Sequence, residues 1–250
     1  MKQSVEWQIA VLKAVKVETS HVKTFTLTLP HWLRHQPGQH YDIRLTAPDG
    51  YQAQRSYSIA SEPEREDEID LTVERIESGE VSTYLHDVLV PGDCVEMRGP
   101  IGGYFVWDGD KNDPLMLVAG GSGVVPLVAM LRHRAAIRKK VPTRLLYSSR
   151  NREDIIYADE LEQLASAGDG LTVTHTLTRV GPSGWQGYHR RIDQEMLAEV
   201  LTPLGKSTQV YICGPTLLVE AASNDLVGLG LTPRQIRTER FGPTRQGTGV

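Results

Sequence analysis

The segment Arg55-Ser56-Tyr57-Ser58 places a cation, an aromatic ring and two hydroxyl groups next to one another. Side chains alternate between the two faces of a strand, so Arg55 and Tyr57 share one face and Ser56 and Ser58 share the other. Arginine can hold a phosphate, and tyrosine can cover a planar ring. This combination suits a ligand that carries both groups.

A second candidate phosphate site follows in the same half of the chain. Gly79-Glu80-Val81-Ser82-Thr83 precedes an expected short helix over residues 84–87. The start of a helix offers unpaired amide groups and the positive end of the helix dipole, which favour an anion. The alternative interpretation is that Ser82 or Thr83 only caps the helix.

The glycine-rich turn Gly120-Gly121-Ser122-Gly123 lies between an apolar run at residues 115–119 and a helical pattern. Amide groups at such a turn favour a phosphate, so it is a candidate dinucleotide site. Pro126 stands where the usual fingerprint has its third glycine, and the pattern is therefore not met in full. Proline suits the first turn of a helix. The alternative is a plain strand–helix turn.

The next expected strand ends in Ser148, Ser149 and Arg150. A carboxylate at this place accepts a bond from the ribose hydroxyl of NAD, whereas an arginine suits the 2′-phosphate of NADP. No carboxylate occupies this strand end, which favours NADPH over NADH. The alternative is a solvated loop arginine.

Two further segments could do chemistry near the C-terminus. Cys213-Gly214-Pro215 follows the last expected parallel strand, at the edge where open α/β sheets bind ligands. Glu239-Arg240-Phe241 comes later in the chain. The alternatives are a buried structural cysteine and an edge strand with one apolar anchor.

These residues need two kinds of scaffold. Apolar residues alternate with polar ones at residues 24–29 and 69–74, and turn residues separate many short runs of this kind, which predicts an antiparallel barrel. After residue 114, apolar strand patterns alternate with helical ones, which predicts a doubly wound parallel sheet. We expect one domain over residues 1–109 and another over 110–250, divided in the polar loop at 108–113.

Composition excludes several classes of protein. The 250 residues contain 27 Lys+Arg and 31 Asp+Glu, so the net charge of −4 gives no general reason to bind nucleic acid. Cys94 and Cys213 are too few for an iron–sulfur cluster, which takes about four cysteines. No apolar run reaches a membrane span, and no signal peptide or metal-ligand spacing is evident. We expect a cytoplasmic protein with Cys94 in the barrel core and no metal, membrane or nucleic-acid partner.

Taken together, the five segments resemble the ferredoxin–NADP⁺ reductase superfamily, and the resemblance runs from about Trp7 to Thr244. It implies a six-stranded antiparallel barrel that binds FAD, followed by a domain that binds NAD(P)H. NADPH would deliver a hydride to flavin N5, and the electrons would leave one at a time. Relatives often carry a fused [2Fe–2S] domain that these residues do not provide.

The resemblance also implies a role for each motif residue in flavin binding. Arg55 would pair with phosphate, Tyr57 would stack on the flavin, and Ser58 would bond near N5, with Ser56 beside them. The remaining expected flavin contacts are Thr72, Val73 and Glu74 through the backbone, Gly79, Val81, Ser82 and Thr83 at the pyrophosphate, and Phe241 on the far face of the ring.

For the nicotinamide nucleotide, Cys213 would lie against the nicotinamide and Glu239 would position it or relay a proton. Ser58, Cys213 and Glu239 are thus the expected catalytic residues. The other expected contacts are Gly121, Ser122 and Gly123 along the nucleotide, Ser148, Ser149, Arg150 and Arg179 at the 2′-phosphate, Tyr157 over the adenine, and Gly214 and Pro215 beside Cys213.

The expected acceptor is a separate protein, such as ferredoxin, flavodoxin or an oxygenase component, or a small molecule. Two alternatives stay open: a reductase of free flavin, and a non-catalytic flavin-binding subunit. The basic run from Arg132 to Lys140 is expected on the outer face and at the end of a helix. It is either a solvated face or a docking patch for an acidic carrier.

Overall fold

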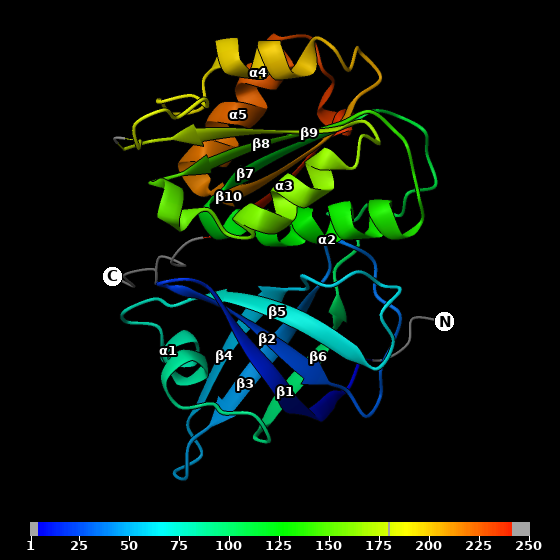
Figure 1. The fold of residues 1–250 in the computed structure, drawn as a ribbon. Coiled ribbons are helices and arrows are strands. Elements are labelled where there is room, and N and C mark those ends of the chain that lie inside the picture. Colours follow the sequence, from blue (N-terminus) through cyan, green and yellow to red (C-terminus); the bar gives the residue numbers. More distant parts are fainter. Residues whose placement is uncertain (1–4, 180, 242–250) are drawn as a thin grey trace, which may run out of the picture.

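The computed structural model describes residues 5–179 and 181–241, which form two domains stacked on one another (Figure 1). The strands of the N-terminal domain are β1 (Trp7–Thr19), β2 (Val22–Thr28), β3 (His40–Thr46), β4 (Gln52–Ser58), β5 (Glu68–Glu74) and β6 (Cys94–Ile101). They form one antiparallel sheet in the order β4-β3-β6-β1-β2-β5. An isolated bridge between Ile59 and Leu71 links the two edges of this sheet. The expected six-stranded antiparallel domain is confirmed.

In the barrel strands, side chains that point into the core alternate with side chains that point outward. Phe25, Leu27, Ile69 and Leu71 point into the barrel core, as their period-two pattern predicts. Cys94 was expected in that core and is exposed instead, at the first position of β6. Helix α1 (Glu80–Asp87) covers one end of the barrel and begins four residues before its expected start.

The second domain is built on a five-stranded parallel sheet in the order β11-β10-β7-β8-β9. Its strands are β7 (Leu115–Gly120), β8 (Thr143–Ser149), β9 (Leu171–Leu177), β10 (Gln209–Pro215) and β11 (Ile236–Phe241). The strand order reverses at β7, which is the doubly wound arrangement expected from the alternation of elements. The first sheet ends at residue 101 and the second begins at residue 115, so the expected boundary at 109–110 falls between them.

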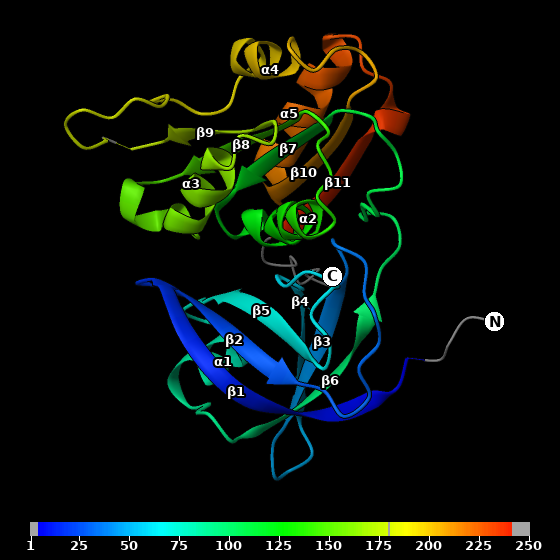
Figure 2. The ribbon, with the colours of Figure 1, turned by 45° about the vertical axis from the view of Figure 1, so that its right-hand side comes forward.

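Helices cover both faces of the parallel sheet. The face toward the barrel carries α2 (Val124–Ala136) and α3 (Ala158–Ser166), and the opposite face carries α4 (Gln194–Leu201) and α5 (Thr216–Gly228) (Figures 1 and 2). Strand β7 is fully buried because its side chains alternate between two cores. Leu117 lies on the α2 side and Val118 lies on the α5 side.

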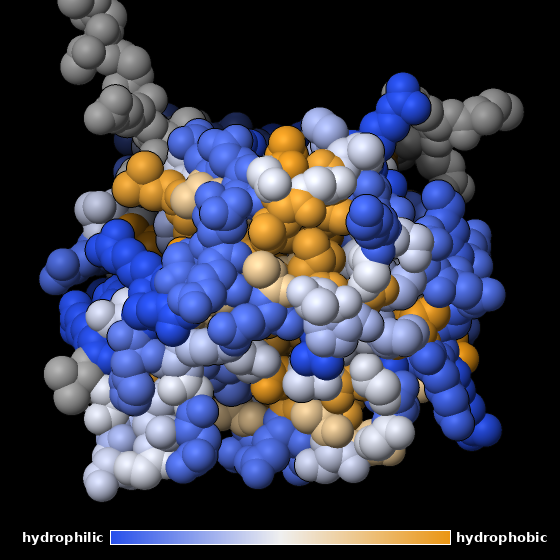
Figure 3. Space-filling view, turned by 90° about the horizontal axis from the view of Figure 1, so that it is seen from above, coloured by the Kyte–Doolittle hydropathy of each residue, from blue (hydrophilic) through white to orange (hydrophobic). Residues whose placement is uncertain are grey.

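The outer face of the second domain is the one formed over α4 and α5. Viewed from above, this face is a mixture in which polar side chains surround smaller apolar areas (Figure 3). Leu201, Leu218 and Leu229 are partly buried there against the core beneath the two helices. In the residues that the structure describes, no helix has the length and apolar character needed to span a membrane.

The two domains share a packed interface. One apolar cluster joins Val22 and Ala60 of the barrel domain to Leu127, Val128 and their neighbours in the parallel-sheet domain. Phe105 and Trp107, which lie in the connection between the domains, are buried in the same cluster. Because this contact is apolar and continuous, it fixes how the two domains face one another.

Candidate functional site

The segment of β4 that carries Arg55 supplies a guanidinium group without an ion pair and a hydroxyl group without a hydrogen-bond partner in the described residues. Arg55 is exposed and, among the described residues, forms no ion pair; one guanidinium nitrogen donates to the carbonyl of Gln54 at 2.6 Å. Ser58 is buried, and its hydroxyl group has no hydrogen-bond partner in the described part of the chain. The hydroxyl of Ser56 donates to Asp42 instead, at 2.6 Å. Buried hydroxyl groups are usually paired, so Ser58 points to a missing partner.

Beside this segment, Tyr57 packs half-buried against the barrel core, and burial raises the pKa of its phenol. At neutral pH the ring is therefore uncharged. Tyr51, from the hairpin before β4, donates to the carboxylate of Glu80 at the start of α1. This contact brings the β4 edge and the beginning of α1 together.

Helix α1 begins without a side-chain cap. Its N-cap is Gly79, and the hydroxyl of Ser82 accepts from the Ile76 amide at 3.1 Å and donates to the Gly79 carbonyl at 3.2 Å. Thr83 also donates to the Gly79 carbonyl. Simple capping by Ser82 or Thr83 is therefore wrong, because both lie inside the helix. The first amides of α1 are left as donors at this turn, while Val81 is buried in the barrel core.

The glycine-rich turn forms a short 3-10 helix, η1 (Gly121–Gly123), that leads directly into α2. Gly121 has φ +55°, and a Cβ atom at this position would meet open space. A Cβ atom on Gly123 would lie 2.2 Å from the carbonyl oxygen of Cys213. Only glycine therefore allows this turn to approach the end of β10 so closely.

One carboxylate of the barrel domain reaches this turn. Glu74, the last residue of β5, accepts a hydrogen bond from the Ser122 hydroxyl at 2.7 Å through Oε2. Its other oxygen, Oε1, lies 3.9 Å from Nη2 of Arg150. Three residues expected in different parts of the site are thus neighbours across the domain interface.

The ends of β8 and β9 bring the predicted phosphate-binding arginines together. Ser148 and Ser149 are buried at the end of β8, and the side chain of Arg150 beyond them is 64% exposed. The amide of Arg179, after β9, donates to the carbonyl of Arg150 at 3.0 Å. The backbones of Arg150 and Arg179 are therefore neighbours at the carboxyl edge of the sheet.

The ends of β10 and β11 place Cys213 and Glu239 side by side in register. Burial raises the pKa of the Cys213 thiol, and the nearby carboxyl of Glu239 raises it further. Cys213 is thus a neutral thiol at pH 7. Burial also raises the pKa of Glu239 to about 7, and its Oε2 has no partner in the described residues. Pro215 is paired in register with Phe241, which is half-buried against the shared cluster.

The side chain of Tyr157 is buried between the two domains, so it leaves no ring face open to an adenine. Its side chain is 3% exposed, and its hydroxyl donates to the hydroxyl of Thr72 on β5, in the other domain. Its backbone has φ +61°, which is uncommon for a non-glycine residue. Arg132 lies 5.0 Å from the centre of the tyrosine ring and donates to the Ala60 carbonyl at 2.7 Å. The expected adenine contact is wrong, because the residue is a buried link between domains. No motif in the sequence around Tyr157 indicates a contact between the two domains.

Removing this hydroxyl should weaken the contact between domains. We expect Tyr157→Phe to lower the free energy of unfolding by about 0.5–1.5 kcal/mol, the usual value of one hydrogen bond. Urea titration of the variant measures this change. Tyr104→Phe is the control, because Tyr104 is 63% exposed and its hydroxyl makes only a long bond to Ile236. Equal stability of the two variants would contradict the role of Tyr157.

The basic run on α2 is not a solvated patch. Arg134 is 1% exposed and pairs with Asp169 at 2.7 Å, while Arg132 pairs with Glu160 at 2.7 Å. His133 is also buried and contacts Glu64 of the barrel domain at 3.0 Å. Arg138 is exposed, just beyond the helix. Both interpretations fail for Arg132, His133 and Arg134, because these residues form pairs within the structure. For the exposed Arg138 and Lys140 the two interpretations stay predictions.

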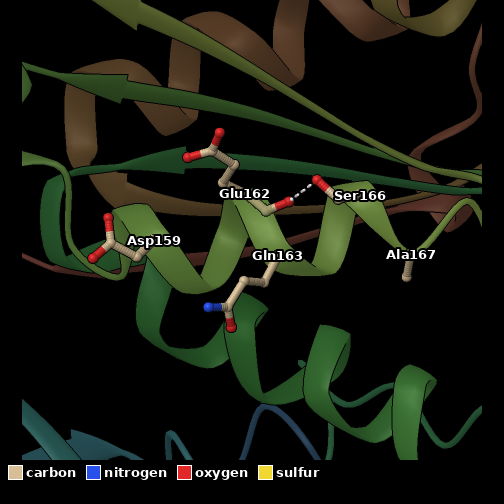
Figure 4. A pocket seen from close by; sticks show the side chains of 5 residues that line it. All are labelled: Asp159, Glu162, Gln163, Ser166 and Ala167. Atoms are coloured by element: carbon tan, nitrogen blue, oxygen red, sulfur yellow. Dashed lines mark hydrogen bonds between the residues drawn. The ribbon is translucent and has the colours of Figure 1, made fainter.

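A separate depression lies along α3. It is an open depression of about 500 Å³ whose lining comes from that helix and the residue after it (Figure 4). Its lining residues are Asp159, Glu162, Gln163, Ser166 and Ala167. None of the motif residues contributes to it. Across residues 5–179 and 181–241, no three His, Cys, Asp or Glu side chains group as a metal site requires.

Comparison with known proteins bears on this arrangement. Residues 9–106 match the family model described as an oxidoreductase FAD-binding domain, and residues 117–224 match the oxidoreductase NAD-binding domain. Ferredoxin–NADP reductase B of Sorangium cellulosum is 38% identical over 212 residues, which cover 82% of this chain and 85% of that protein. The chain belongs to the ferredoxin–NADP⁺ reductase superfamily.

Two further members of this superfamily extend the comparison. The glycine betaine monooxygenase reductase subunit of Pseudomonas aeruginosa is 32% identical over 239 residues, and the match covers 94% of this chain. The chain spans only 64% of the length of that relative. The FAD/NAD-binding domain of a nitric oxide dioxygenase from Vibrio cholerae superposes with a TM-score of 0.83 at 26% identity, covering 94% of this chain and 99% of that one.

The residues present fit the two ligands of this superfamily. The unpartnered Ser58 hydroxyl, the unpaired Arg55 and the uncapped start of α1 are donors that a flavin nucleotide would satisfy. Gly121 leaves open space beside the turn where a pyrophosphate would lie. Turn η1 contacts β5, β8, β10 and β11, so it is the point at which the predicted segments of both domains meet.

Proposed function

We propose that this chain is a flavin-dependent reductase that oxidises NADPH and delivers electrons singly to a separate acceptor protein. The acceptor would be a ferredoxin, a flavodoxin or an oxygenase component. The observation that carries the proposal is the contact of β5 with η1, through Glu74 and Ser122 at 2.7 Å. This contact brings η1 next to the end of β5, which supports a site shared by the flavin and the nicotinamide nucleotide.

In this proposal Arg55 and the first amides of α1 hold the flavin pyrophosphate, and Tyr57 lies against the ring. FAD, when bound, accepts two electrons as a hydride and releases them one at a time. The Ser58 hydroxyl would donate at the ring edge. Thr72, Val73 and Glu74 run beside the ligand along β5 and use their backbone groups.

The parallel-sheet domain orients the nicotinamide nucleotide. Gly121 and Gly123 let the pyrophosphate approach the turn, with Ser122 beside it. Cys213, a small neutral thiol, allows a planar ring to lie close to the end of β10. Gly214 and Pro215 continue that edge, and Phe241 closes it. Glu239 can hold or release a proton at Oε2 near neutral pH, since its pKa is about 7.

A spectrum of the purified protein tests the proposal. We expect a yellow protein whose flavin absorbance is bleached by stoichiometric NADPH without oxygen, and whose extracted flavin is FAD. Colourless protein that takes up no FAD would contradict it. Flavin that leaves on desalting and is consumed as a substrate would identify a free-flavin reductase. Bound FAD without NADPH oxidation by any acceptor would identify a non-catalytic subunit.

The preference for NADPH has its own test. Arg150 and Arg179 would share the 2′-phosphate, with the hydroxyls of Ser148 and Ser149 beneath. We expect Arg150→Ala to raise KM for NADPH about 10- to 150-fold, which corresponds to the loss of about 1.5–3 kcal/mol from a charge-assisted bond. KM for NADH should change less than about threefold, since NADH lacks that phosphate. Steady-state kinetics with both nucleotides measures the difference, and equal effects on the two would refute the assignment.

A further inference from the structure

One carboxylate of the barrel domain stands at the place where the nucleotide phosphates are expected. Glu74 accepts a hydrogen bond from Ser122 in the glycine-rich turn at 2.7 Å. Its second oxygen is 3.9 Å from the guanidinium of Arg150. Both partners belong to the carboxyl edge of the parallel sheet, because Ser122 follows β7 and Arg150 follows β8. A single anion from outside that domain therefore contacts both groups that would receive an anionic ligand.

This carboxylate resembles a phosphate in its chemistry. Both are anionic oxygen acceptors, and both attract hydroxyl donors and arginine. The start of η1 offers no side-chain cap of its own, and Gly121 beside it borders open space. Glu74 therefore brings a carboxylate from the barrel domain to the side of this turn.

The ion pair between Glu74 and Arg150 is weak because both side chains are partly exposed. The side chain of Glu74 is 31% exposed and that of Arg150 is 64% exposed, so water screens the ion pair. A phosphate group carries more negative charge than a carboxylate, and both can form two parallel hydrogen bonds with a guanidinium group. A bound 2′-phosphate can consequently displace Glu74 from Arg150.

We propose that Glu74 is an internal competitor of the nucleotide 2′-phosphate and so determines how strongly the protein distinguishes NADPH from NADH. This inference rests on the proposed function, because it assumes that the nucleotide binds at this edge. The wild-type protein gives up the Glu74 contacts when the 2′-phosphate arrives, which lowers its affinity for phosphorylated nucleotide. A nucleotide without that phosphate does not need to displace the carboxylate from Arg150.

Calorimetric titration of the flavin-loaded protein with two probes tests this inference. The probes are adenosine 2′,5′-bisphosphate, which carries the 2′-phosphate, and 5′-ADP, which lacks it. We expect Glu74→Gln to tighten binding of the bisphosphate about five- to tenfold, where tenfold corresponds to about 1.4 kcal/mol. Binding of 5′-ADP should change less than about threefold, that is by less than 0.7 kcal/mol. Glutamine keeps an acceptor for Ser122, and it replaces the charged carboxylate beside Arg150 with a neutral amide of nearly the same size.

Two further variants make the result specific. Glu77→Gln removes an exposed charge three residues along the chain and should leave both affinities unchanged. In the Arg150→Ala background, Glu74→Gln should no longer tighten bisphosphate binding, because the competing partner is gone. Flavin absorbance is measured on every preparation so that equally loaded proteins are compared.

The outcomes separate this inference from the proposed function. Unchanged or weaker bisphosphate binding by Glu74→Gln, with normal binding of 5′-ADP, would overturn the inference alone. An equal gain for both probes would also overturn it, because the effect would then be general charge repulsion. A protein that binds neither probe would overturn the proposed function together with the inference.

Discussion

Glu239→Gln is expected to slow NADPH oxidation by about a hundredfold, the lower end of the range for loss of a proton-transferring group. The same variant should lose a dependence of the rate on pH that is centred near pH 7 in the wild-type protein. Glu239 lies beside Cys213 in register, and burial raises the pKa of its carboxyl to about 7. Glutamine has nearly the same size and cannot exchange a proton.

Rates measured from pH 5.5 to pH 9 with both proteins test this prediction. Glu220→Gln is the matched control, because Glu220 is exposed on α5 in the same domain. We expect that variant to keep the wild-type rate and its pH profile. If the rate of Glu239→Gln still changed with pH around pH 7, the titrating group would be another residue.

The same pKa predicts a change in stability with pH. The carboxyl ionises near 4.5 in the unfolded chain and near 7 in the folded protein. Between these values the folded protein keeps a proton that the unfolded chain has released. Stability from this group is therefore fully present below pH 4.5 and is lost as the pH rises through 7. Glu239→Gln should therefore gain about 2–3 kcal/mol of unfolding free energy relative to the wild-type protein between pH 4.5 and pH 8. Urea titration of both proteins across this range measures the change.

Loss of flavin is the expected result of Arg55→Ala. Arg55 forms no ion pair with the described residues, so its charge is available to a phosphate. Losing that contact should weaken flavin binding about 10- to 150-fold, which corresponds to about 1.5–3 kcal/mol for a hydrogen bond to a charged group. The ratio of flavin absorbance to protein absorbance after desalting measures the loss, and titration of the flavin-free protein with FAD gives the affinity.

Gln54→Ala is the control for this experiment. Gln54 precedes Arg55 on β4, is also exposed, and points to the opposite face of the strand. We expect it to retain flavin as the wild-type protein does. Arg55→Lys should recover part of the affinity, because lysine keeps the charge and loses the paired geometry of the guanidinium group. Full flavin retention by Arg55→Ala would remove Arg55 from the site.

Local patterns explain why much of the fold could be predicted. Alternation over Phe25, Leu27 and Leu29 predicts a half-buried strand, because each residue's face depends only on its place in the period. The apolar run at 115–119, followed by glycine and then a helical pattern, similarly predicts β7, η1 and α2. The candidate phosphate-binding turn at Gly121–Gly123 is visible in the sequence for the same reason, since the turn itself requires glycine.

The wrong predictions concern residues whose burial depends on contacts with distant parts of the chain. Arg134 was expected in solvent because it belongs to a basic run, yet it pairs with Asp169, which lies 35 residues later. Cys94 was expected in the core because cysteine is often buried, yet it is exposed at the first position of β6. Residue type gives a preference for burial, and the position of the element in the fold overrides it.

By itself, the sequence determined the two-domain architecture, the order of the motif segments and the membership of a superfamily, because periodicity, turn residues and spacing are local properties of the chain. Only the tertiary structure decided which side chains meet across the domain interface. Glu74 and Ser122 are 48 residues apart, and Thr72 and Tyr157 are 85 apart. Such contacts depend on how two complete domains pack, and no local pattern contains that information.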